Sequence, residues 1–464
     1  MKKDSEKKLK GSITARNYQG TRDWLGREVL TRLNVMDTLR QVFIEFGFEP
    51  LETPELELYE VLSGKYGTEG EELSYKFKHG DSYIGLRYDH TVPLARVVIQ
   101  HQDEIVFPYR RYAMGPVFRA EKPQRGRYRR FIQCDFDIVG MEDPIADAEV
   151  IALTYTALRR LGFEKFEIQI CDRRLLNGIA IASGADTKEL ILAFLRSWDK
   201  LEKVTKEQIT KELKEEGADS ELVLKFFRTT EKILSFDKRN ILSEIRKIFP
   251  NQPLVLEGAD ILEKITGYLA DFGISDQFYR VNPCLARGLD YYTGPIFETV
   301  IKEGDIGSLT GGGRFDGLIK TLGGPDIPAT GSSFGLERII SVMEKLGISK
   351  DKKTTTEVFV ATFDSTSSIL VKKAVQLAAR LRAEGIKTEL SMEGGNIGKQ
   401  LRIPDRRGIP IVVFAGPKEI EKSKVIVKSL TKPFLTGEKN MWENQWEIPE
   451  DAFIGKIKEL LNKR

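Results

Sequence analysis

One segment of the chain combines residue types that bind anions with residue types that bind cations. Residues 118 to 140, FRAEKPQRGRYRRFIQCDFDIVG, hold a dense group of Arg and Lys and then an alternating apolar and acidic run. Side chains alternate along a strand, so Gln133, Asp135 and Asp137 are expected on one face and the apolar residues on the other. Asp and Gln accept hydrogen bonds from an ammonium group, whereas the planar Arg fork binds carboxylate or phosphate. The pattern indicates a site for a small zwitterion.

Opposed charges recur in other segments that have the character of strands. They are Arg87 with Asp89 in LRYDHT, Arg119 with Glu121 in VFRAE, and Arg287 beside Asp290, Tyr291 and Tyr292 in LARGLDYY. A half-exposed antiparallel sheet with a wet outer face would explain any one of these segments. Their recurrence predicts a sheet whose polar face forms the floor of a pocket.

Two segments rich in small residues follow later in the chain. LTGGGRFDGL (309–318) matches neither phosphate-loop pattern, GxxxxGK[ST] or GxGxxG, so a turn is predicted there. ATGSSFGLERI (329–339) is expected to line the start of a helix that carries Arg338, whose apolar neighbours favour a buried Arg with an anionic partner. His90 and His101 have no adjacent nucleophile motif, so catalytic histidines are not expected.

The composition argues against several classes of protein. Lys and Arg number 72 against 69 Asp and Glu in 464 residues, a net charge of +3, which is unlike a histone-like or membrane-coating protein. Cys134, Cys171 and Cys284 lie far apart and only three His occur, so neither a zinc site nor a disulfide framework is expected. No segment approaches ~18 consecutive apolar residues, and the charged N-terminus lacks a following apolar region. A cytoplasmic protein without a membrane segment is predicted.

Length and periodicity predict two domains. Helical spacing marks residues 29–48 and 143–163, and a long antiparallel hairpin is expected within residues 82–140. The predicted order is a frayed tail (1–14), a first domain (15–347) with a helical insertion at about 172–278, a polar linker (348–356) and a compact α/β domain (357–464).

These segments together resemble the histidyl-tRNA synthetases, a family of class II aminoacyl-tRNA synthetases. FRAE with its loop and RFIQCDFDIVG is similar to motif 2, GSSFGLERI to motif 3, LRYDHT to the histidine-site strand and LARGLDYYTGPIFE to the family's signature peptide. EGGNIGKQLRIPDRRGIPIVVFAGPKE is similar to the anticodon-binding domain. The resemblance extends from about Ala15 to the end and is weakest in the helical insertion.

The resemblance implies an α+β fold: an antiparallel sheet of six or seven strands flanked by helices, with a helical insertion, plus a C-terminal α/β anticodon-binding domain. It also implies a homodimer that uses ATP with Mg²⁺, L-histidine and tRNA(His), in two steps. Histidine attacks the α-phosphorus of ATP to give histidyl-adenylate and pyrophosphate, and the histidyl group then moves to the 3′ end of the tRNA. No protein ligand to a metal is expected.

By resemblance, one group of residues holds the amino acid. Asp89, Thr91 and Gln133 are expected at its α-ammonium side, and Asp137 with Tyr291 or Tyr292 at its imidazole. A donor and acceptor pair shaped to both ring nitrogens would reject analogues that lack them.

A second group is expected at the phosphates. Arg119 would contact the α-phosphate and the histidine carboxylate, and Arg287 would stand near both reacting groups; these two are the expected catalytic residues. Glu121 would lie at the adenine, and Arg127 and Arg338 at the phosphates. Two anions must meet here, so fixed Arg donors would stabilise the charge that develops. From the basic loop, Lys122, Gln124 and Arg125 are expected to meet the tRNA acceptor end.

The chain departs from the family pattern in three places. His90 stands where an aliphatic residue is common, with its side chain expected off the ligand face, Pro404 predicts a kink in a helix, and EKNMWENQWEIPED carries two Trp. The alternatives are a regulatory subunit of ATP phosphoribosyltransferase, which keeps the catalytic fold but lacks the anticodon-binding domain, and a nucleic-acid binding module without catalysis.

Overall fold

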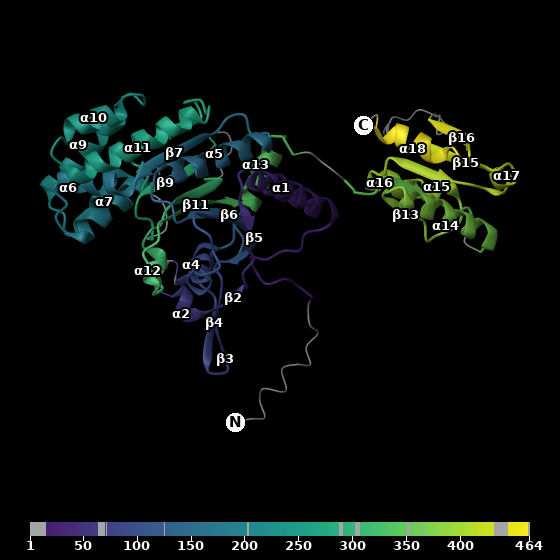
Figure 1. Ribbon diagram of the computed structural model, residues 1–464, viewed down its shortest axis with the longest axis horizontal. Coiled ribbons are helices and arrows are strands. Elements are labelled where there is room, and N and C mark those ends of the chain that lie inside the picture. Colours follow the sequence, from purple (N-terminus) through teal and green to yellow (C-terminus); the bar gives the residue numbers. More distant parts are fainter. Residues whose placement is uncertain are drawn as a thin grey trace. The chain divides into compact units, whose positions relative to one another are not determined.

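The computed structural model describes residues 15–63, 70, 72–124, 126–201, 204–286, 291–301, 307–349, 353–364, 366–430 and 444–462 (Figure 1). Contacts divide the chain into two compact units, Met1–Asp23 with Asn34–Ser349, and Trp24–Leu33 with Lys350–Arg464. Within the described ranges, no helix is long and apolar enough to cross a membrane.

The larger unit is built on an eight-stranded sheet in the order β1-β5-β6-β11-β10-β9-β7-β8. The strands are β1 (Glu49–Pro50), β5 (Tyr109–Phe118), β6 (Arg130–Val139), β7 (Glu167–Asp172), β8 (Tyr279–Val281), β9 (Pro295–Val300), β10 (Thr310–Arg314) and β11 (Ala329–Gly335). The six strands from β5 to β7 are antiparallel, as expected, and the edge strands β1 and β8 each pair in parallel with their neighbours. The sheet therefore has eight strands where six or seven were expected, and both of its edges are short parallel strands.

The predicted hairpin is β5 with β6, which pair over ten residues from Tyr109↔Val139 to Phe118↔Arg130. The period of two in β6 is confirmed: Cys134 and Phe136 are buried in the hydrophobic core, whereas Gln133, Asp135 and Asp137 line a cavity on the opposite face. This strand thus separates the core of the unit from its polar site.

Three helices cover the apolar face of the sheet, namely α1 (Gly26–Glu45), α5 (Ile145–Arg160) and α13 (Leu336–Lys345). The ring of Phe43 on α1 lies 5.3 Å from that of Phe136, which stacks at 5.4 Å on Phe334 of β11. These aromatic contacts bury large apolar areas and fix the central strands against the helices.

Helices and short connecting loops make up the predicted insertion in the residues described. It contains α6 (Arg173–Ala182), α7 (Lys188–Lys200), α8 (Lys206–Glu215), α9 (Ser220–Leu234), α10 (Ile241–Ile248) and α11 (Pro253–Asp271), a group beside the sheet in Figure 1. Thr187, Thr205 and Asp219 each cap a helix by accepting from the backbone N–H three residues on. A β-carbon at Gly258 would lie 2.7 Å from the backbone N of Leu175, so α11 crosses α6 in close contact.

A three-stranded sheet in the order β2-β4-β3 and three short helices complete this unit. They are β2 (Leu56–Leu58), β3 (Lys76–His79), β4 (Ser82–Leu86), α2 (Tyr59–Leu62), α4 (Thr91–Gln100) and α12 (Leu318–Thr321). Because β4 ends at Leu86, the expectation that Arg87 and Asp89 share a strand face is wrong. Arg87 turns away from the cavity and donates to the carbonyls of Thr53 and Pro116 at 2.7 and 2.8 Å.

Strands occupy most of both segments, since β10 covers Thr310–Arg314 and β11 covers Ala329–Gly335, where a turn and a helix start were predicted. The turn is confined to residues 316–317, and the helix that carries Arg338 begins only at Leu336. In β10 a β-carbon at Gly312 would lie 2.3 Å from the carbonyl oxygen of Gly331 and 2.4 Å from the Phe297 ring. Gly312 and Gly331 are needed for close approach between strands, a role that β-propensity does not indicate.

The smaller unit has a five-stranded sheet in the order β13-β12-β14-β15-β16. Its elements are β12 (Val358–Val360), α14 (Ser368–Ala383), β13 (Thr388–Leu390), α15 (Ile397–Gln400), α16 (Arg402–Arg407), β14 (Ile411–Phe414), α17 (Pro417–Glu421), β15 (Lys424–Ser429), β16 (Gln445–Pro449) and α18 (Phe453–Asn462). The helix expected to kink at Pro404 is divided at Leu401. Of the segment with two Trp, only its end lies in the described residues, where Trp446 is on β16.

Candidate active site

The polar face of the large sheet opens into a cavity of about 750 Å³. Its walls come from β6, β9, β10 and β11, from the loop after β5, from the start of α13 and from the residues just before β9. One end is acidic and the other basic, as the charge pattern of the sequence predicts.

Three buried carboxylates mark the acidic end. Asp89, Asp135 and Asp137 all line the cavity and are at most 3% exposed. Burial raises the pKa of Asp89 and of Asp135. Burial also raises the pKa of Asp137 to about 7, against the effect of Arg111 and with a contribution from the other two carboxylates. This end of the cavity favours a ligand that brings positive charge or several N–H donors.

Arg111 supplies a buried cation to this group. It stands opposite Asp137 in the β5–β6 register, with Nη2 2.7 Å from Asp137 Oδ2, and it donates to the carbonyl oxygen of His90 at 3.1 Å. The residue is fully buried. The sequence analysis missed it, because only the register between β5 and β6 shows that Arg111 shares a face with Asp137.

A glycine makes room for the Asp137 carboxylate. Gly331 is its cross-strand neighbour on β11, and a β-carbon at Gly331 would lie 2.0 Å from Asp137 Oδ1. No residue with a side chain can therefore stand at position 331 unless the carboxylate moves.

Asp89 and the two tyrosines form the next part of the wall. Asp89 Oδ1 accepts from the backbone N–H groups of Thr91 and Val92 at the start of α4, at 3.0 and 3.1 Å. The Tyr291 hydroxyl donates to Asp89 Oδ2 at 3.5 Å, and the rings of Tyr291 and Tyr292 are 5.0 Å apart. Burial, followed by the charge of Asp137, raises the pKa of Tyr292, so this hydroxyl stays protonated as a donor.

Gln133 also lines the cavity and is fixed by its amide nitrogen, which donates to Ser333 Oγ at 3.1 Å. Its buried Oε1 has no hydrogen-bond partner in the described part of the chain. An unsatisfied buried acceptor is costly, so this oxygen is suited to accept from a bound ligand.

Guanidinium groups gather at the basic end. Arg119 donates to the carbonyl oxygen of Tyr88 at 3.3 Å and lies over the Tyr88 ring at 4.2 Å. Arg338 on α13 donates to the carbonyl oxygen of Ser308 at 3.0 Å. Burial, followed by the charges of Arg127 and Arg119, lowers the pKa of the Arg338 guanidinium. Three cations face one cavity, so this end is suited to a polyanion.

An ion pair and two backbone hydrogen bonds join the two arms of the basic loop, which lies between β5 and β6. Glu121 pairs with Arg127, and the backbone groups of Gln124 and Arg127 exchange two hydrogen bonds of 3.0 and 3.1 Å. Arg129 fixes the loop to the N-terminal segment, since its backbone N–H donates to the carbonyl oxygen of Gly20 at 2.8 Å. The loop can thus present Arg127 to the cavity from a defined base.

The structure brings together most of the residues named by the sequence. The cavity wall includes Asp89, Thr91, Arg119, Glu121, Gln124, Arg127, Gln133, Asp137, Tyr291, Tyr292 and Arg338. Lys122 is exposed and outside the wall. Arg125, Arg287 and Asp290 lie outside the described residues. His90 is not part of the wall and contacts the carbonyl oxygen of Gly115 at 3.3 Å, in agreement with its expected orientation off the ligand face.

Two carboxylates at the basic end, Glu121 and Glu298, are possible ligands of a metal ion. No group of three or more His, Cys, Asp or Glu side chains that could hold a metal ion occurs among the residues the structure describes. Glu121 and Glu298 nevertheless both line the cavity. One or two carboxylates with substrate phosphates are the usual ligands of Mg²⁺, so the site fits an ion that arrives with a nucleotide.

Known proteins and family models match the chain over both of its units. A family model described as histidyl-tRNA synthetase matches residues 20–339, and one described as anticodon binding domain matches residues 357–460. The histidine–tRNA ligase of Cytophaga hutchinsonii is 36% identical over 463 residues, which cover 95% of this chain and 98% of that protein. That of Gloeobacter violaceus is 38% identical over 444 residues, 89% and 94% of the two chains. A crystal structure of histidyl-tRNA synthetase from a Nostoc species is 28% identical with a TM-score of 0.80, covering 97% of this chain and all of that one.

Proposed function

Since this chain belongs to the histidyl-tRNA synthetase family of class II aminoacyl-tRNA synthetases, we propose that it joins L-histidine to tRNA(His) through a histidyl-adenylate formed from ATP. Pyrophosphate leaves in the first step and AMP in the second. The observation that supports this most directly is one cavity with three buried carboxylates at one end and three guanidinium groups at the other.

The acidic end would bind histidine. Asp89, Thr91 and Gln133 would hold the α-ammonium group, for which the unpartnered Gln133 Oε1 is a suitable acceptor. Asp137, with the hydroxyl of Tyr291 or Tyr292, would recognise the two imidazole nitrogens. Buried polar groups of this kind reject analogues that leave them unpaired.

The basic end would bind ATP. Arg119 would contact the histidine carboxylate and the α-phosphate, Arg127 and Arg338 the phosphates, and Glu121 the adenine end. Both reactants are anions, so cations already fixed before reaction lower the barrier by stabilising the charge that grows at the α-phosphorus. The carboxylate of the substrate is the nucleophile, and no protein nucleophile is required.

The remaining roles follow from the family. In place of the expectation that no protein group binds the metal, Glu298 would hold Mg²⁺ together with the phosphates, and the ion would neutralise part of their charge. Lys122, Gln124 and Arg125 would meet the acceptor end of the tRNA, and residues 357–464 would bind its anticodon. We place the catalytic domain at 15–347, with the insertion at about 172–278, after a tail (1–14) and before a linker (348–356). The protein would act as a homodimer in the cytoplasm.

The regulatory-subunit alternative is disfavoured, because such a subunit lacks an anticodon-binding domain and this chain matches one over residues 357–460. A nucleic-acid binding module without catalysis would not need the buried carboxylates and Gln133 of the acidic end.

Exchange of labelled pyrophosphate into ATP tests the first step. We expect exchange that depends on L-histidine, and no exchange when histidine is omitted or replaced by another amino acid. Charging of a tRNA(His) transcript, with a different tRNA as control, tests the second step. Absence of histidine-dependent exchange with pure, folded protein would refute the proposal.

Arg287→Ala tests the assigned catalytic residue. The variant should fold normally and lose adenylate formation, since the guanidinium is proposed to stand at the reacting carboxylate and α-phosphate. Near-normal exchange would remove Arg287 from the mechanism without affecting the proposed reaction.

A further inference from the structure

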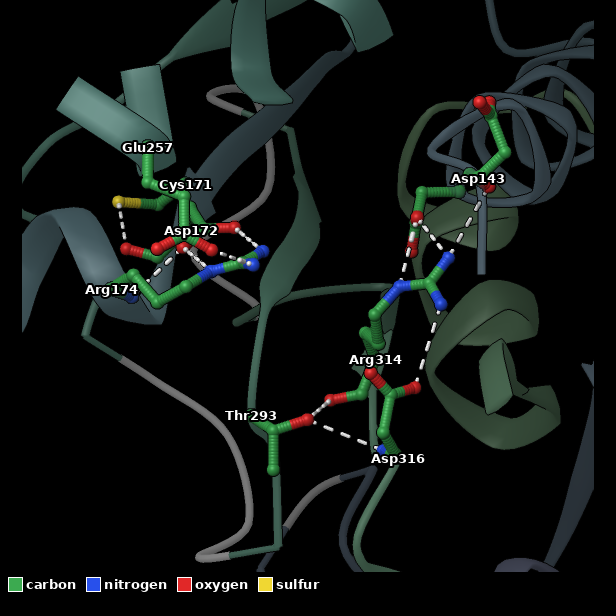
Figure 2. Close-up of polar contacts among 9 residues, drawn as sticks. Asp143, Cys171, Asp172, Arg174, Glu257, Thr293, Arg314 and Asp316 are labelled. Carbon is green, nitrogen blue, oxygen red and sulfur yellow. Dashed lines mark hydrogen bonds and ion pairs between the residues drawn. The ribbon is translucent and has the colours of Figure 1, made fainter. Parts of the chain in front are cut away.

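Thr293 and Gly294, the two residues that follow the cavity tyrosines, lie between two arginine–aspartate pairs. Figure 2 shows Thr293 together with Arg174 and Arg314. Arg314 at the end of β10 donates to Asp147 Oδ2 on α5 through Nη2 at 2.6 Å and Nε at 3.1 Å. Arg174 on α6 donates to both oxygens of Asp172, at 3.0 and 2.8 Å. We call these two pairs, with residues 293–294 between them, the clamp.

Backbone hydrogen bonds join the enclosed segment to both sides of the clamp. The N–H of Thr293 donates to the carbonyl oxygen of Arg314 at 2.8 Å, and the carbonyl oxygen of Gly294 accepts from the N–H of Arg173 at 2.9 Å. The Thr293 hydroxyl accepts from the N–H of Asp316 at 3.2 Å, as Figure 2 shows. The segment is therefore tied to β10 on one side and to α6 on the other.

The side chains of the clamp also contact the segment closely. A β-carbon at Gly294 would lie 3.2 Å from Arg174 Nη2 and 3.2 Å from Arg314 Cδ. Glycine at this position lets both arginines approach the same peptide. The backbone between them has little freedom to shift unless one arginine moves.

Burial distinguishes the clamp from ordinary surface ion pairs. The side chains of Asp147 and Asp172 are 0% exposed, and that of Arg314 is 5% exposed. A buried ion pair often contributes no more stability than apolar residues of the same volume, but it specifies geometry. Neither Arg174 nor Arg314 lines the cavity, so neither is placed to contact a ligand bound there.

The segment carries the aromatic part of the cavity wall. Tyr291 reaches Asp89, and Cδ1 of Tyr292 lies 2.9 Å from where a β-carbon at Gly313 would be. One residue, Thr293, separates Tyr292 from Gly294. A small rotation of the backbone at 293–294 would move the hydroxyl groups at the far ends of both rings.

We propose that Arg174 and Arg314, through the clamp, are positioning residues for recognition of the amino acid: they hold Tyr291 and Tyr292 against the acidic end of the cavity. This inference rests on the proposed function, in which these tyrosines face the imidazole of histidine. Histidine binding should depend on the clamp, and ATP binding should not, because the phosphate residues lie on the basic loop and α13.

Two variants weaken the clamp without opening a large cavity. Arg174→Met keeps the length of the side chain and removes its hydrogen bonds to Asp172, and Thr293→Val replaces the hydroxyl by a methyl group. Arg246→Met is the control for loss of an arginine outside the clamp. Like Arg174, Arg246 has a side chain that is 26% exposed and pairs with two carboxylates, but it lies on α10 and its partners Asp260 and Glu263 are 67% exposed.

Exchange kinetics and titration calorimetry with histidine give the readouts. In Arg174→Met and Thr293→Val we expect the KM and Kd for histidine to rise by about tenfold, since a small misplacement of recognition groups has an effect of this order. The KM for ATP should stay within about twofold. Arg174→Lys, which keeps a charge for Asp172, should recover part of the histidine affinity. Arg246→Met should behave as the wild type.

Three results would overturn the inference: unchanged histidine affinity in both clamp variants, equal loss of histidine and ATP affinity, or the same loss in Arg246→Met. Calorimetry with the unaltered protein distinguishes failure of the positioning role from failure of the proposed function. If the unaltered protein binds histidine and both clamp variants bind it with the same affinity, the positioning role alone fails. If it binds no histidine, both fail.

Discussion

Arg111 and Asp137 form an ion pair inside the protein, across the β5–β6 hairpin, with 2.7 Å between Nη2 and Oδ2. The same carboxylate is one wall of the cavity. The Asp137 carboxylate, which is proposed to recognise the ligand, is thus held in place by the buried cation Arg111, and several measurable effects follow.

Removing the Arg111 guanidinium should lower the free energy of unfolding. The loss should be smaller when the Asp137 carboxylate is neutralised as well. Arg111→Met leaves Asp137 and Asp135 without their nearest buried cation, and loss of one partner of a buried pair costs about 3–5 kcal/mol. Urea denaturation should show this loss for Arg111→Met and a smaller one for the double variant with Asp137→Asn. Additive effects of the two substitutions would contradict a direct coupling between the residues.

The stability contribution of Asp137 should depend on pH in a defined direction. Its pKa is raised from 3.8 to about 7, so the folded state retains a proton that the unfolded state releases. The associated stability is fully present below the unfolded value and is lost as the pH rises through about 7. Asp137→Asn should therefore gain stability relative to the unaltered chain as the pH is raised from 4 to 8 in steps of about one unit. A difference that does not change with pH would rule out titration of Asp137 in this range.

Gly331→Ala should disable the acidic end of the cavity. The new β-carbon would lie 2.0 Å from Asp137 Oδ1 and 2.7 Å from the carbonyl oxygen of Phe136, so the carboxylate must be displaced. We expect a fall in kcat/KM for histidine of about 100-fold and a lower Tm. Gly311→Ala on the adjacent strand meets nothing within 4 Å and serves as the control for Tm, which it should leave unchanged. Normal histidine kinetics in Gly331→Ala would place recognition elsewhere.

Arg338→Gln should separate activity from stability. Arg338 is half-buried, and burial, followed by repulsion from Arg127 and Arg119, lowers the pKa of its guanidinium, so its charge is unfavourable until an anion binds. The KM for ATP should rise by about tenfold or more, while the Tm stays the same or rises. Arg130→Gln, at an exposed position outside the cavity wall, is the control for ATP. A lower Tm without a change in the KM for ATP would indicate a structural role for Arg338.

Periodicity made part of this site predictable. The alternation in β6 placed Gln133 and Asp137 on the ligand face and Phe136 in the core, because strand geometry fixes the side-chain direction once the strand is identified. Helix caps such as Thr187 and Asp219 likewise mark helix starts by local chemistry. These features depend only on residues close together in the sequence.

Contacts between strands were harder to predict from the sequence. Arg111 meets Asp137 through a register that spans the whole hairpin, and Gly331 is required by a side chain on the neighbouring strand. The glycines of β10 have low strand propensity, so local pattern favoured a turn although tertiary contacts require a strand. Arg87 was misplaced because β4 ends one residue before it and alternation stops there.

The bare backbone at Gly331 also bears on the design of inhibitors. On its β11 side the acidic end is bounded by the main chain of Gly331 and by the Asp137 carboxylate beside it. Main chain cannot rotate aside as a long side chain can, so a compound bound beside Asp137 cannot be extended past Gly331. Chemical elaboration must proceed toward Arg119, Arg127 and Arg338, where flexible side chains can rearrange around an added acidic group.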